Sequence, residues 1–87
     1  MSAEYKVEIL PAARKELASF HDPLFKRMAR QLRSLALEPR PRGCRKLVGT
    51  TSDYRIRVGD HRIAYEVDDS TRRVVVYRIG HRRDVYE

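Results

Sequence analysis

Polar and apolar residues alternate along several short stretches of the chain. The pattern is clearest in YRIRVGDHRIAY, residues 54–65, and it also occurs in YKVEIL, residues 5–10. A period of two is typical of a β-strand with one buried face. Residues 73–79, RVVVYRI, are rich in β-branched side chains and predict a central strand that ends at Gly80. A short strand is also predicted at residues 46–49, KLVG.

A helical period replaces the alternation after Pro11. Ala13, Leu17 and Phe20 recur at i, i+4 and i+7, which places them on one face of a helix. Proline suits the first turn of a helix, because the amide hydrogen that it lacks has no intrahelical partner there. A first helix is therefore predicted from Pro11 to about Phe20.

A second helix is predicted immediately afterwards. Its apolar stripe consists of Leu24, Met28, Leu32 and Leu35 or Ala36. Asp22 is a suitable N-cap, and Pro23 suits the first helical position. Pro39 and Pro41 predict that the helix ends near Glu38, because proline disfavours helical backbone in the residue before it. Only a tight turn fits between the two helices, so they should form an antiparallel hairpin.

The order of these elements defines the fold class. An N-terminal strand is followed by a two-helix hairpin and then by three or four antiparallel strands, which is an α+β arrangement with helices on one face of a twisted sheet. Eighty-seven residues leave room for one domain, residues 1–87. The helices should cover the apolar face of the sheet and leave the other face open.

The central hairpin should place its arginines on that open face. A Gly-Asp turn at residues 59–60 fits type II′, in which glycine takes the first central position. The register set by this turn pairs Arg57 with Arg62 and Arg55 with Ala64. Because side chains alternate between faces, these four residues share one face. The opposite, core-facing side carries Tyr54, Ile56, Val58, His61, Ile63 and Tyr65.

The composition indicates an anionic partner. Nineteen lysines and arginines exceed 12 aspartates and glutamates, so the net charge is +7 and the pI is near 10.1. Such a balance is typical of proteins that bind nucleic acid, an anionic membrane surface or an acidic protein. Fifteen of the 19 cations are arginines, whose planar fork binds phosphate through two hydrogen bonds. With no apolar run long enough for a membrane span and no signal-peptide pattern, we expect a cytoplasmic protein.

The end of the chain carries groups that are able to do chemistry. The segment GHRRDVY, residues 80–86, directly follows the last predicted strand. His81 is able to exchange protons near neutral pH. Arg82 and Arg83 add two guanidinium groups, and Tyr86 can stack on a base or donate a hydrogen bond. We expect these residues to arrive at the edge of the sheet beside the arginines.

Taken together, these stretches resemble the RelE branch of the RelE/ParE toxin superfamily. The resemblance lies in the hairpin RIRVGDHR, residues 55–62, combined with GHRRDVY, residues 80–86. The start EILPAARKEL, residues 8–17, and the loop PRPRGCRKLVG, residues 39–49, agree with it. The resemblance covers nearly the whole chain and implies a RelE-like fold.

The resemblance also implies an activity and partners. Members of this branch are toxins of type II toxin–antitoxin pairs, and the best understood cut mRNA in the ribosomal A site and so inhibit translation. The ribose 2′-hydroxyl attacks the adjacent phosphate without a metal or cofactor, and Cys44, the single cysteine, offers no metal site here. The implied partners are a RelB-like antitoxin, in a heterodimer or heterotetramer, together with the ribosome and mRNA.

Roles for individual residues follow from the same resemblance. Arg55 and Arg57 occupy the basic hairpin positions of the family, and Arg62 occupies its phosphate-binding arginine. Arg82 corresponds to the arginine at the leaving group, and Tyr86 to the tyrosine that orients the cleaved nucleotide. The implied catalytic residues are Arg55, Arg57, Arg62, His81, Arg82 and Tyr86, and the implied RNA-binding residues are Arg55, Arg57, Arg62, Arg82 and Arg83.

Two features depart from the pattern of the family. Well-studied RelE toxins carry lysine at one or both of the positions where Arg55 and Arg57 stand. Arginine does not readily lose a proton, so these two residues should stabilise charge rather than act as a base. His81 is then the candidate for proton transfer. His61, which replaces the common tyrosine of the turn, is a second candidate.

Two other functions fit the same sequence. A ParE-like toxin shares the fold but poisons DNA gyrase by binding, and it would not need the basic and tyrosine residues of a nuclease site; the tail GHRRDVY argues against it. A non-enzymatic module that binds RNA or the ribosome would use the same arginines for affinity alone. Cleavage of mRNA separates the nuclease from this module, and a gyrase supercoiling assay tests the ParE-like function.

Overall fold

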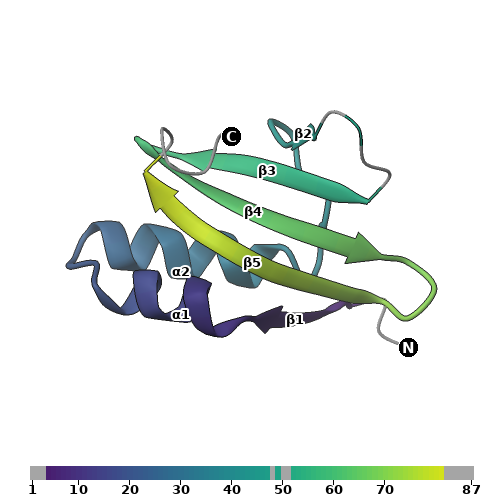
Figure 1. Ribbon diagram of the computed structural model, residues 1–87, viewed down its shortest axis with the longest axis horizontal. Helices are drawn as coiled ribbons and strands as arrows, with labels where there is room; N and C mark the ends of the chain where they lie inside the picture. The colour runs from purple at the N-terminus through teal and green to yellow at the C-terminus, as the bar shows by residue number, and fades with distance from the viewer. Residues whose placement is uncertain (1–3, 48, 50–51, 82–87) are drawn as a thin grey trace.

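The structure is a computed structural model that describes residues 4–47, 49 and 52–81. Over these residues, two helices lie side by side on one face of a twisted five-stranded sheet (Figure 1). The elements are β1 (Lys6–Ile9), α1 (Pro11–Ala18), α2 (Leu24–Ser34), β2 (Arg45–Lys46), β3 (Asp53–Val58), β4 (His61–Asp68) and β5 (Arg73–His81). The predicted α+β fold is confirmed. No helix of the described chain has the length and apolar character needed to cross a membrane.

The sheet contains the predicted antiparallel strands and also one parallel strand, β1. The strand order is β1-β5-β4-β3-β2, and the neighbours from β2 to β5 are all antiparallel. β1 joins the same sheet next to β5 and is parallel to it. The chain between β1 and β5, which contains both helices and the strands β2 to β4, provides the long connection that a parallel pair requires. The sheet is therefore mixed, and β5 lies between β1 and β4.

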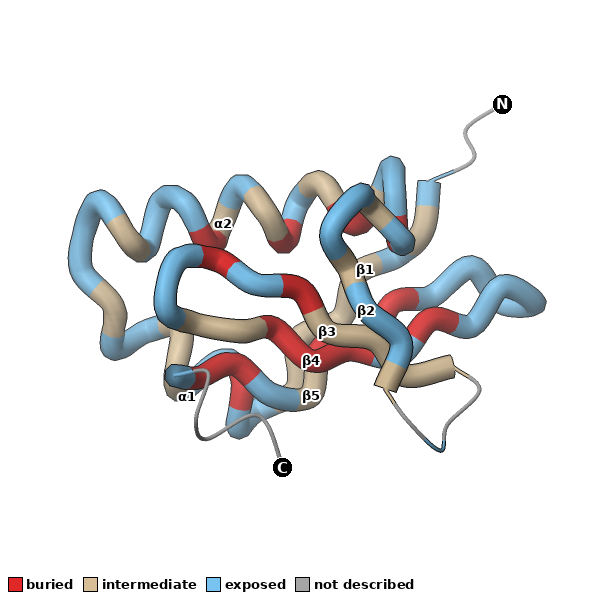
Figure 2. The backbone as a smooth tube through the Cα atoms, turned by 90° about the horizontal axis from the view of Figure 1, so that it is seen from above, coloured by how far each residue is buried: buried red, intermediate tan, exposed pale blue. Residues whose placement is uncertain are grey.

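The predicted apolar stripes form the core between the helices and the sheet. Met28, Leu32 and Leu35 from the second stripe are buried, as is Ala13 from the first. Figure 2 shows that the buried segments run along β3, β4, β5 and α2. The other buried core residues are Ile56, Val58, Ile63, Tyr65, Val67, Val74, Val76 and Ile79. Neither helix of the described residues lies on the opposite face of the sheet (Figure 1).

The helix boundaries agree with the prediction at Pro11 and differ at both ends of α2. This helix ends at Ser34, four residues before the predicted end near Glu38. Pro11 is the first residue of α1. The predicted N-cap at Asp22 is wrong, because α2 begins at Leu24 and is preceded by Pro23 in a helical backbone conformation. The Asp22 carboxylate instead lies 3.6 Å from the ammonium group of Lys26, one helical turn along the chain. Such an exposed pair contributes little to stability.

The β3–β4 hairpin has the predicted register. Arg57 pairs with Arg62, and Arg55 pairs with Ala64. Gly59 has a φ of 62°, whereas Asp60 has no positive φ, as a type II′ turn requires. Glycine adopts this conformation without the steric cost that a Cβ atom brings. The turn therefore determines which side chains reach the open face.

β5 contains a bulge that changes which of its residues face the helices. Tyr65 pairs with Val76, but the residue before Tyr65 pairs with Arg78, so Tyr77 is an extra residue on β5. An extra residue shifts the alternation of side chains beyond it. Val76 and Ile79 are consequently both buried although they are three positions apart. Past the bulge, the odd-numbered residues of β5 face the helices.

A polar clasp fixes the loop that leads from α2 to β2. The Arg40 guanidinium donates hydrogen bonds to the Asp69 carboxylate, at 2.8 and 3.2 Å, and to the Tyr54 hydroxyl at 2.9 Å. The Tyr5 hydroxyl donates to the same carboxylate at 2.5 Å. Beneath this clasp, the buried Tyr65 hydroxyl donates to the carbonyl of Pro39 at 2.8 Å. These contacts hold the loop against the sheet and so position β2 at its edge.

Candidate functional site

Four arginines line one hollow on the open face of the sheet. The hollow has a volume of about 360 Å³ and is lined by Gly43, Arg45, Arg55, Arg57 and Arg62. Three strands contribute the arginines: β2 provides Arg45, β3 provides Arg55 and Arg57, and β4 provides Arg62. We call this the arginine hollow.

Strand pairing brings these side chains together. Arg45 pairs with Arg55 across β2 and β3, and Arg57 pairs with Arg62 across β3 and β4. Like charges directly opposite one another on a sheet are destabilising by some tenths of a kcal/mol, roughly 0.2–1 for each pair. An anion that enters the hollow relieves this repulsion while it gains charge-assisted hydrogen bonds. The arrangement is therefore suited to a phosphate group.

The arginines are partly ordered by their own surroundings. The Nε atoms of Arg55 and Arg62 are buried. Arg57 is exposed, and its Nε atom donates a hydrogen bond to the carbonyl of Gly59 at 2.9 Å. This bond ties Arg57 to the hairpin turn and leaves its two terminal nitrogens directed away from that contact. Partial ordering lowers the entropy that the arginines lose when they bind an anion.

The far end of the open face is acidic. Asp53 pairs with Glu66 across β3 and β4, and the Ser52 hydroxyl donates to Glu66 at 3.2 Å. Burial, and then the neighbouring Glu66 carboxylate, raise the pKa of Asp53. Burial also raises the pKa of Tyr77, and the two carboxylates add to this rise. The open face thus runs from an arginine-rich end near the hairpin turn to an acidic end.

His81 lies on the helix side of the sheet. β5 continues one residue beyond the predicted end at Gly80, and there His81 pairs with His61 while Gly80 pairs with Arg62. The rings of His61 and His81 meet edge to face with centroids 5.6 Å apart, and the ring centroid of Phe20 lies 4.9 Å from that of His61. Since His61 is on the core-facing side of the hairpin, His81 is separated by the sheet from the arginine hollow.

A comparison with protein families accounts for this combination of fold and site. The sequence model of the ParE toxin of the type II toxin–antitoxin system, parDE, matches residues 7–86. The chain belongs to this toxin family. It is a toxin of the RelE/ParE superfamily, as its sequence motifs suggest. No curated protein matches the sequence.

Several solved structures similar to this toxin are RelE proteins in complex with RelB. The RelE–RelB complex of Pyrococcus horikoshii OT3 is similar with a TM-score of 0.82 and 30% identity, over 91% of this chain and 96% of the other. The RelBE2 complex of Mycobacterium tuberculosis has a TM-score of 0.78 and 26% identity, over 92% and 100%. The RelB–RelE complex of Methanococcus jannaschii has a TM-score of 0.71 and 25% identity, over 91% and 94%.

The toxin fold brings together only part of the predicted site. Arg55, Arg57 and Arg62 line one hollow, as the hairpin register predicts. His81 lies on the other side of the sheet. The remaining predicted residues, Arg82, Arg83 and Tyr86, lie outside the described residues. No cluster of three or more potential metal ligands occurs among residues 4–47, 49 and 52–81.

Sequence reasoning missed Arg45. Its strand, β2, has two residues and begins one position before the strand that the sequence predicts. So short a strand has no periodicity that would reveal which residue faces the arginine hollow. One sequence feature could have pointed to Arg45. It belongs to a run of basic residues, PRPRGCRK, residues 39–46, which comes just before a hairpin that carries three arginines.

Proposed function

We propose that this toxin is a ribosome-dependent endoribonuclease that cleaves mRNA in the A site and inhibits translation. The observation that carries the proposal is the convergence of Arg45, Arg55, Arg57 and Arg62 on one hollow of an open sheet face. RNA cleavage by an internal hydroxyl needs cations around the phosphate and a substrate held in line. The ribosome supplies the positioning of the codon, and the arginine hollow supplies the cations.

In the proposed reaction, the 2′-oxygen of one nucleotide attacks its own 3′-phosphate. The new P–O2′ bond forms as the P–O5′ bond breaks, and the products are a 2′,3′-cyclic phosphate and a 5′-hydroxyl end. The 2′-hydroxyl gives up a proton, and the leaving 5′-oxygen takes one. Arg62 and Arg57, paired across β3 and β4, would bind the non-bridging oxygens of the phosphorane, where negative charge develops. Arg55 and Arg45 would hold the ground-state phosphate beside them.

The two proton transfers belong to other groups. Arginine does not serve as a base, because its pKa lies far above the physiological range. His81 stays our proposed proton-transfer residue, with Arg82 and Tyr86 at the leaving group and at the cleaved nucleotide. The ring of His81 lies across the sheet from the hollow, so this assignment is tested separately from that of the arginines.

We further propose an antitoxin of the RelB type as the partner that controls this toxin, in a heterodimer or heterotetramer. The similar structures from Pyrococcus horikoshii, Mycobacterium tuberculosis and Methanococcus jannaschii are toxin–antitoxin complexes, which supports such a partner. An acidic antitoxin segment would complement the net charge of +7. The proposed site of action is the cytoplasm, and we treat residues 1–87 as one toxin domain.

A ParE-like inhibitor of DNA gyrase is the second candidate. The matching family model is described as the ParE toxin, and this observation favours it. A gyrase inhibitor acts by binding and does not require arginines that converge on one hollow. A non-catalytic module that binds RNA or the ribosome would use the same hollow but would leave the RNA intact.

Purified components distinguish the three functions. The toxin is added to ribosomes that carry a defined mRNA with its A-site codon exposed, and the mRNA is examined by primer extension. The nuclease proposal predicts a cut inside the A-site codon, with a 5′-hydroxyl on the downstream fragment, that is lost in Arg62→Ala. Intact mRNA together with inhibited supercoiling by gyrase would instead establish the ParE-like function. Intact mRNA with unaffected gyrase, and with toxin bound to ribosomes, would establish the non-catalytic module.

A further inference from the structure

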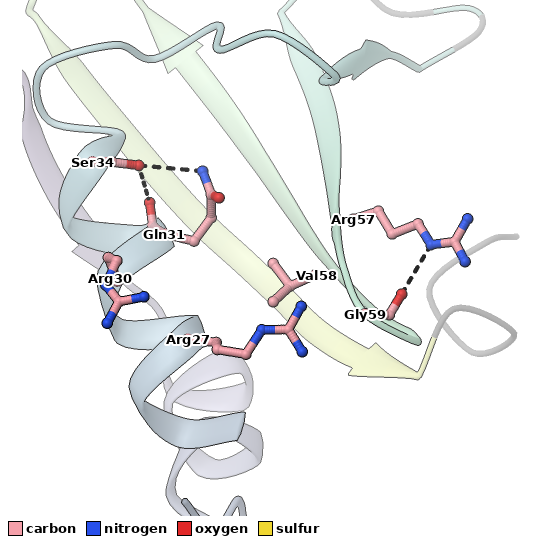
Figure 3. Close-up of a pocket in the computed structure, with 7 residues that line it drawn as sticks. All are labelled: Arg27, Arg30, Gln31, Ser34, Arg57, Val58 and Gly59. Atoms are coloured by element: carbon pink, nitrogen blue, oxygen red, sulfur yellow. Dashed lines mark hydrogen bonds between the residues drawn. The ribbon is translucent and has the colours of Figure 1, made fainter. Parts of the chain in front are cut away.

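A second basic cleft lies between helix α2 and the tip of the β3–β4 hairpin. It has a volume of about 340 Å³, and Figure 3 shows that the helix forms one wall and the hairpin the other. Its lining residues are Arg27, Arg30, Gln31, Ser34, Arg57, Val58 and Gly59. We call it the α2 cleft. None of its lining residues is acidic, and three of the seven are arginines.

The arginines of the α2 cleft have no competing carboxylate in the described part of the chain. Arg27 and Arg30 are both exposed, and neither forms an ion pair with a residue in 4–47, 49 or 52–81. The ion pairs of this part of the chain lie elsewhere, between Lys26 and Asp22, Arg40 and Asp69, and Arg73 and Glu8. The cleft is therefore a cationic surface open to an external anion.

The hairpin turn is shaped to admit the Arg27 side chain. In Figure 3, Arg27 extends from α2 towards the turn. A Cβ atom built on Gly59 would lie 3.5 Å from a terminal guanidinium nitrogen of Arg27, so the guanidinium rests against the bare glycine backbone. Arg57 contacts the same turn, because its Nε atom donates to the Gly59 carbonyl.

Arg57 connects the α2 cleft to the arginine hollow, because it lines both. Six arginines from four elements consequently follow one path: from the hollow on the open face, past Arg57 at the edge of the sheet, to Arg27 and Arg30 on α2. A path that carries cations along its length fits a chain that carries anions along its length. The polyanion with that property is the phosphate backbone of a nucleic acid.

We propose that the α2 cleft is a phosphate-binding subsite for the same RNA strand whose reacting phosphate occupies the arginine hollow. Arg27 and Arg30 bind a backbone phosphate further along that strand, and Arg57 lies between the two phosphates. The inference rests on RNA as the partner proposed above, but it does not require that the RNA be cleaved. An acidic polypeptide is a less suitable occupant, because the lining offers Val58 as its sole apolar side chain to hold one.

Salt-dependent binding tests the subsite. The full chain is titrated against a short fluorescent single-stranded RNA at several potassium chloride concentrations, and the slope of log Kd against log salt is measured. Arg27→Ala/Arg30→Ala is compared with Lys15→Ala/Arg33→Ala, which removes the same charge from exposed helical positions outside the cleft. All four positions are exposed, so the variants should fold, and circular dichroism checks this.

The cleft variant should lose two phosphate contacts. A single-stranded contact contributes about 0.7 to the slope, so the slope should fall by about 1.4 and affinity at low salt should weaken about tenfold or more. The control variant should keep the wild-type slope. An unchanged slope in the cleft variant, or an equal fall in the control, would overturn the subsite.

Two further arms identify the occupant and separate this inference from the proposed function. Poly-L-glutamate replaces the RNA in a parallel titration. If the cleft variant lost poly-L-glutamate binding and kept RNA binding, the occupant would be an acidic polypeptide and the subsite proposal would be wrong.

The A-site cleavage assay is run on the same preparations. If the salt slope falls in the cleft variant but the wild type does not cleave mRNA, the subsite is supported and the nuclease is rejected. If the wild type cleaves mRNA but the slope of the cleft variant is unchanged, the nuclease is supported and the subsite is rejected.

Discussion

Arg57 and Arg62 stand opposite each other in the β3–β4 hairpin, where two like charges oppose pairing. The hairpin is stabilised from its other face, where Ile56 and Ile63 pair and are buried in the core. Burying one large aliphatic side chain contributes about 1.5–3 kcal/mol, which exceeds the repulsion of roughly 0.2–1 kcal/mol between one pair of like charges on a sheet. The hairpin therefore remains stable with two arginines opposite each other, and an anion that binds between them relieves their repulsion.

Arg45 is a test of the arginine hollow at the scale of one residue. Arg45→Ala should reduce A-site cleavage by about tenfold or more, because one charge-assisted hydrogen bond to the phosphate is lost. Lys46→Ala is the matched control, since Lys46 is adjacent on β2 and does not line the hollow. Single-turnover cleavage on programmed ribosomes measures both variants. Equal rates in the two variants would remove Arg45 from the site.

The sequence predicts which face of the sheet a side chain occupies where a local turn sets the strand register. It does not predict the face where pairing with a strand distant in the sequence sets it. Arg55, Arg57 and Arg62 share a face because a two-residue turn sets their register. His81 was expected beside these arginines. The bulge at Tyr77 shifts the alternation of β5 by one residue and turns Ile79 and His81 towards the helices. A bulge arises from cross-strand pairing, so the local sequence of β5 does not reveal it.

At the scale of elements, the hairpin turn depends on Gly59. Its φ of 62° is in the left-handed region, where a residue with a Cβ atom pays a steric cost of about 1–2 kcal/mol. Gly59→Ala should lower the free energy of unfolding by about that amount, and urea denaturation measures it. Asp60→Ala, at the second turn position, should change it by less than about 0.5 kcal/mol. Similar losses for both variants would contradict the assigned turn type.

The clasp around Asp69 should make stability depend on pH. Hydrogen bonds from Arg40, and then from Tyr5, lower the pKa of Asp69 in the folded protein. A lowered carboxyl pKa stabilises the fold above the pKa of the unfolded chain, about 3.9, and this contribution disappears as pH falls through the folded-state pKa. The urea midpoint of wild type should exceed that of Asp69→Asn at pH 6–7, and the difference should shrink below about pH 4. A difference that stays constant with pH would show that the clasp is not ionic.

The elements themselves follow from sequence more completely than their assembly. Both helical stripes, the hairpin and the β5 strand lie where their periodicities predict. The parallel pairing of β1 with β5 was not predicted, since it joins residues more than sixty positions apart, such as Val7 and Val74. The two-residue strand β2 forms by pairing with β3, and two residues are too few to show a period, so its register and Arg45 escaped prediction.

At the scale of the whole molecule, six of the 19 lysines and arginines line two neighbouring sites, the arginine hollow and the α2 cleft. The helices cover one face of the sheet, and the arginine hollow and the α2 cleft occupy the open face and the adjoining edge. Arginines that converge from separate elements on one path can bind an extended phosphate backbone, whereas scattered surface charge only raises non-specific affinity. The acidic pair Asp53 and Glu66 marks the end of this path on the open face.

The measurement that most directly tests the proposed nuclease is a map of mRNA 5′ ends after the toxin is induced in cells. Wild type should create new ends inside translated codons, and Arg62→Ala should abolish them. Arg33→Ala, an equal loss of charge on α2 away from the hollow, should leave the cuts in place. His81→Ala in the same series decides whether the imidazole transfers a proton. Growth arrest with intact mRNA, or cuts that persist in Arg62→Ala, would contradict the assignment of the arginine hollow as a nuclease site.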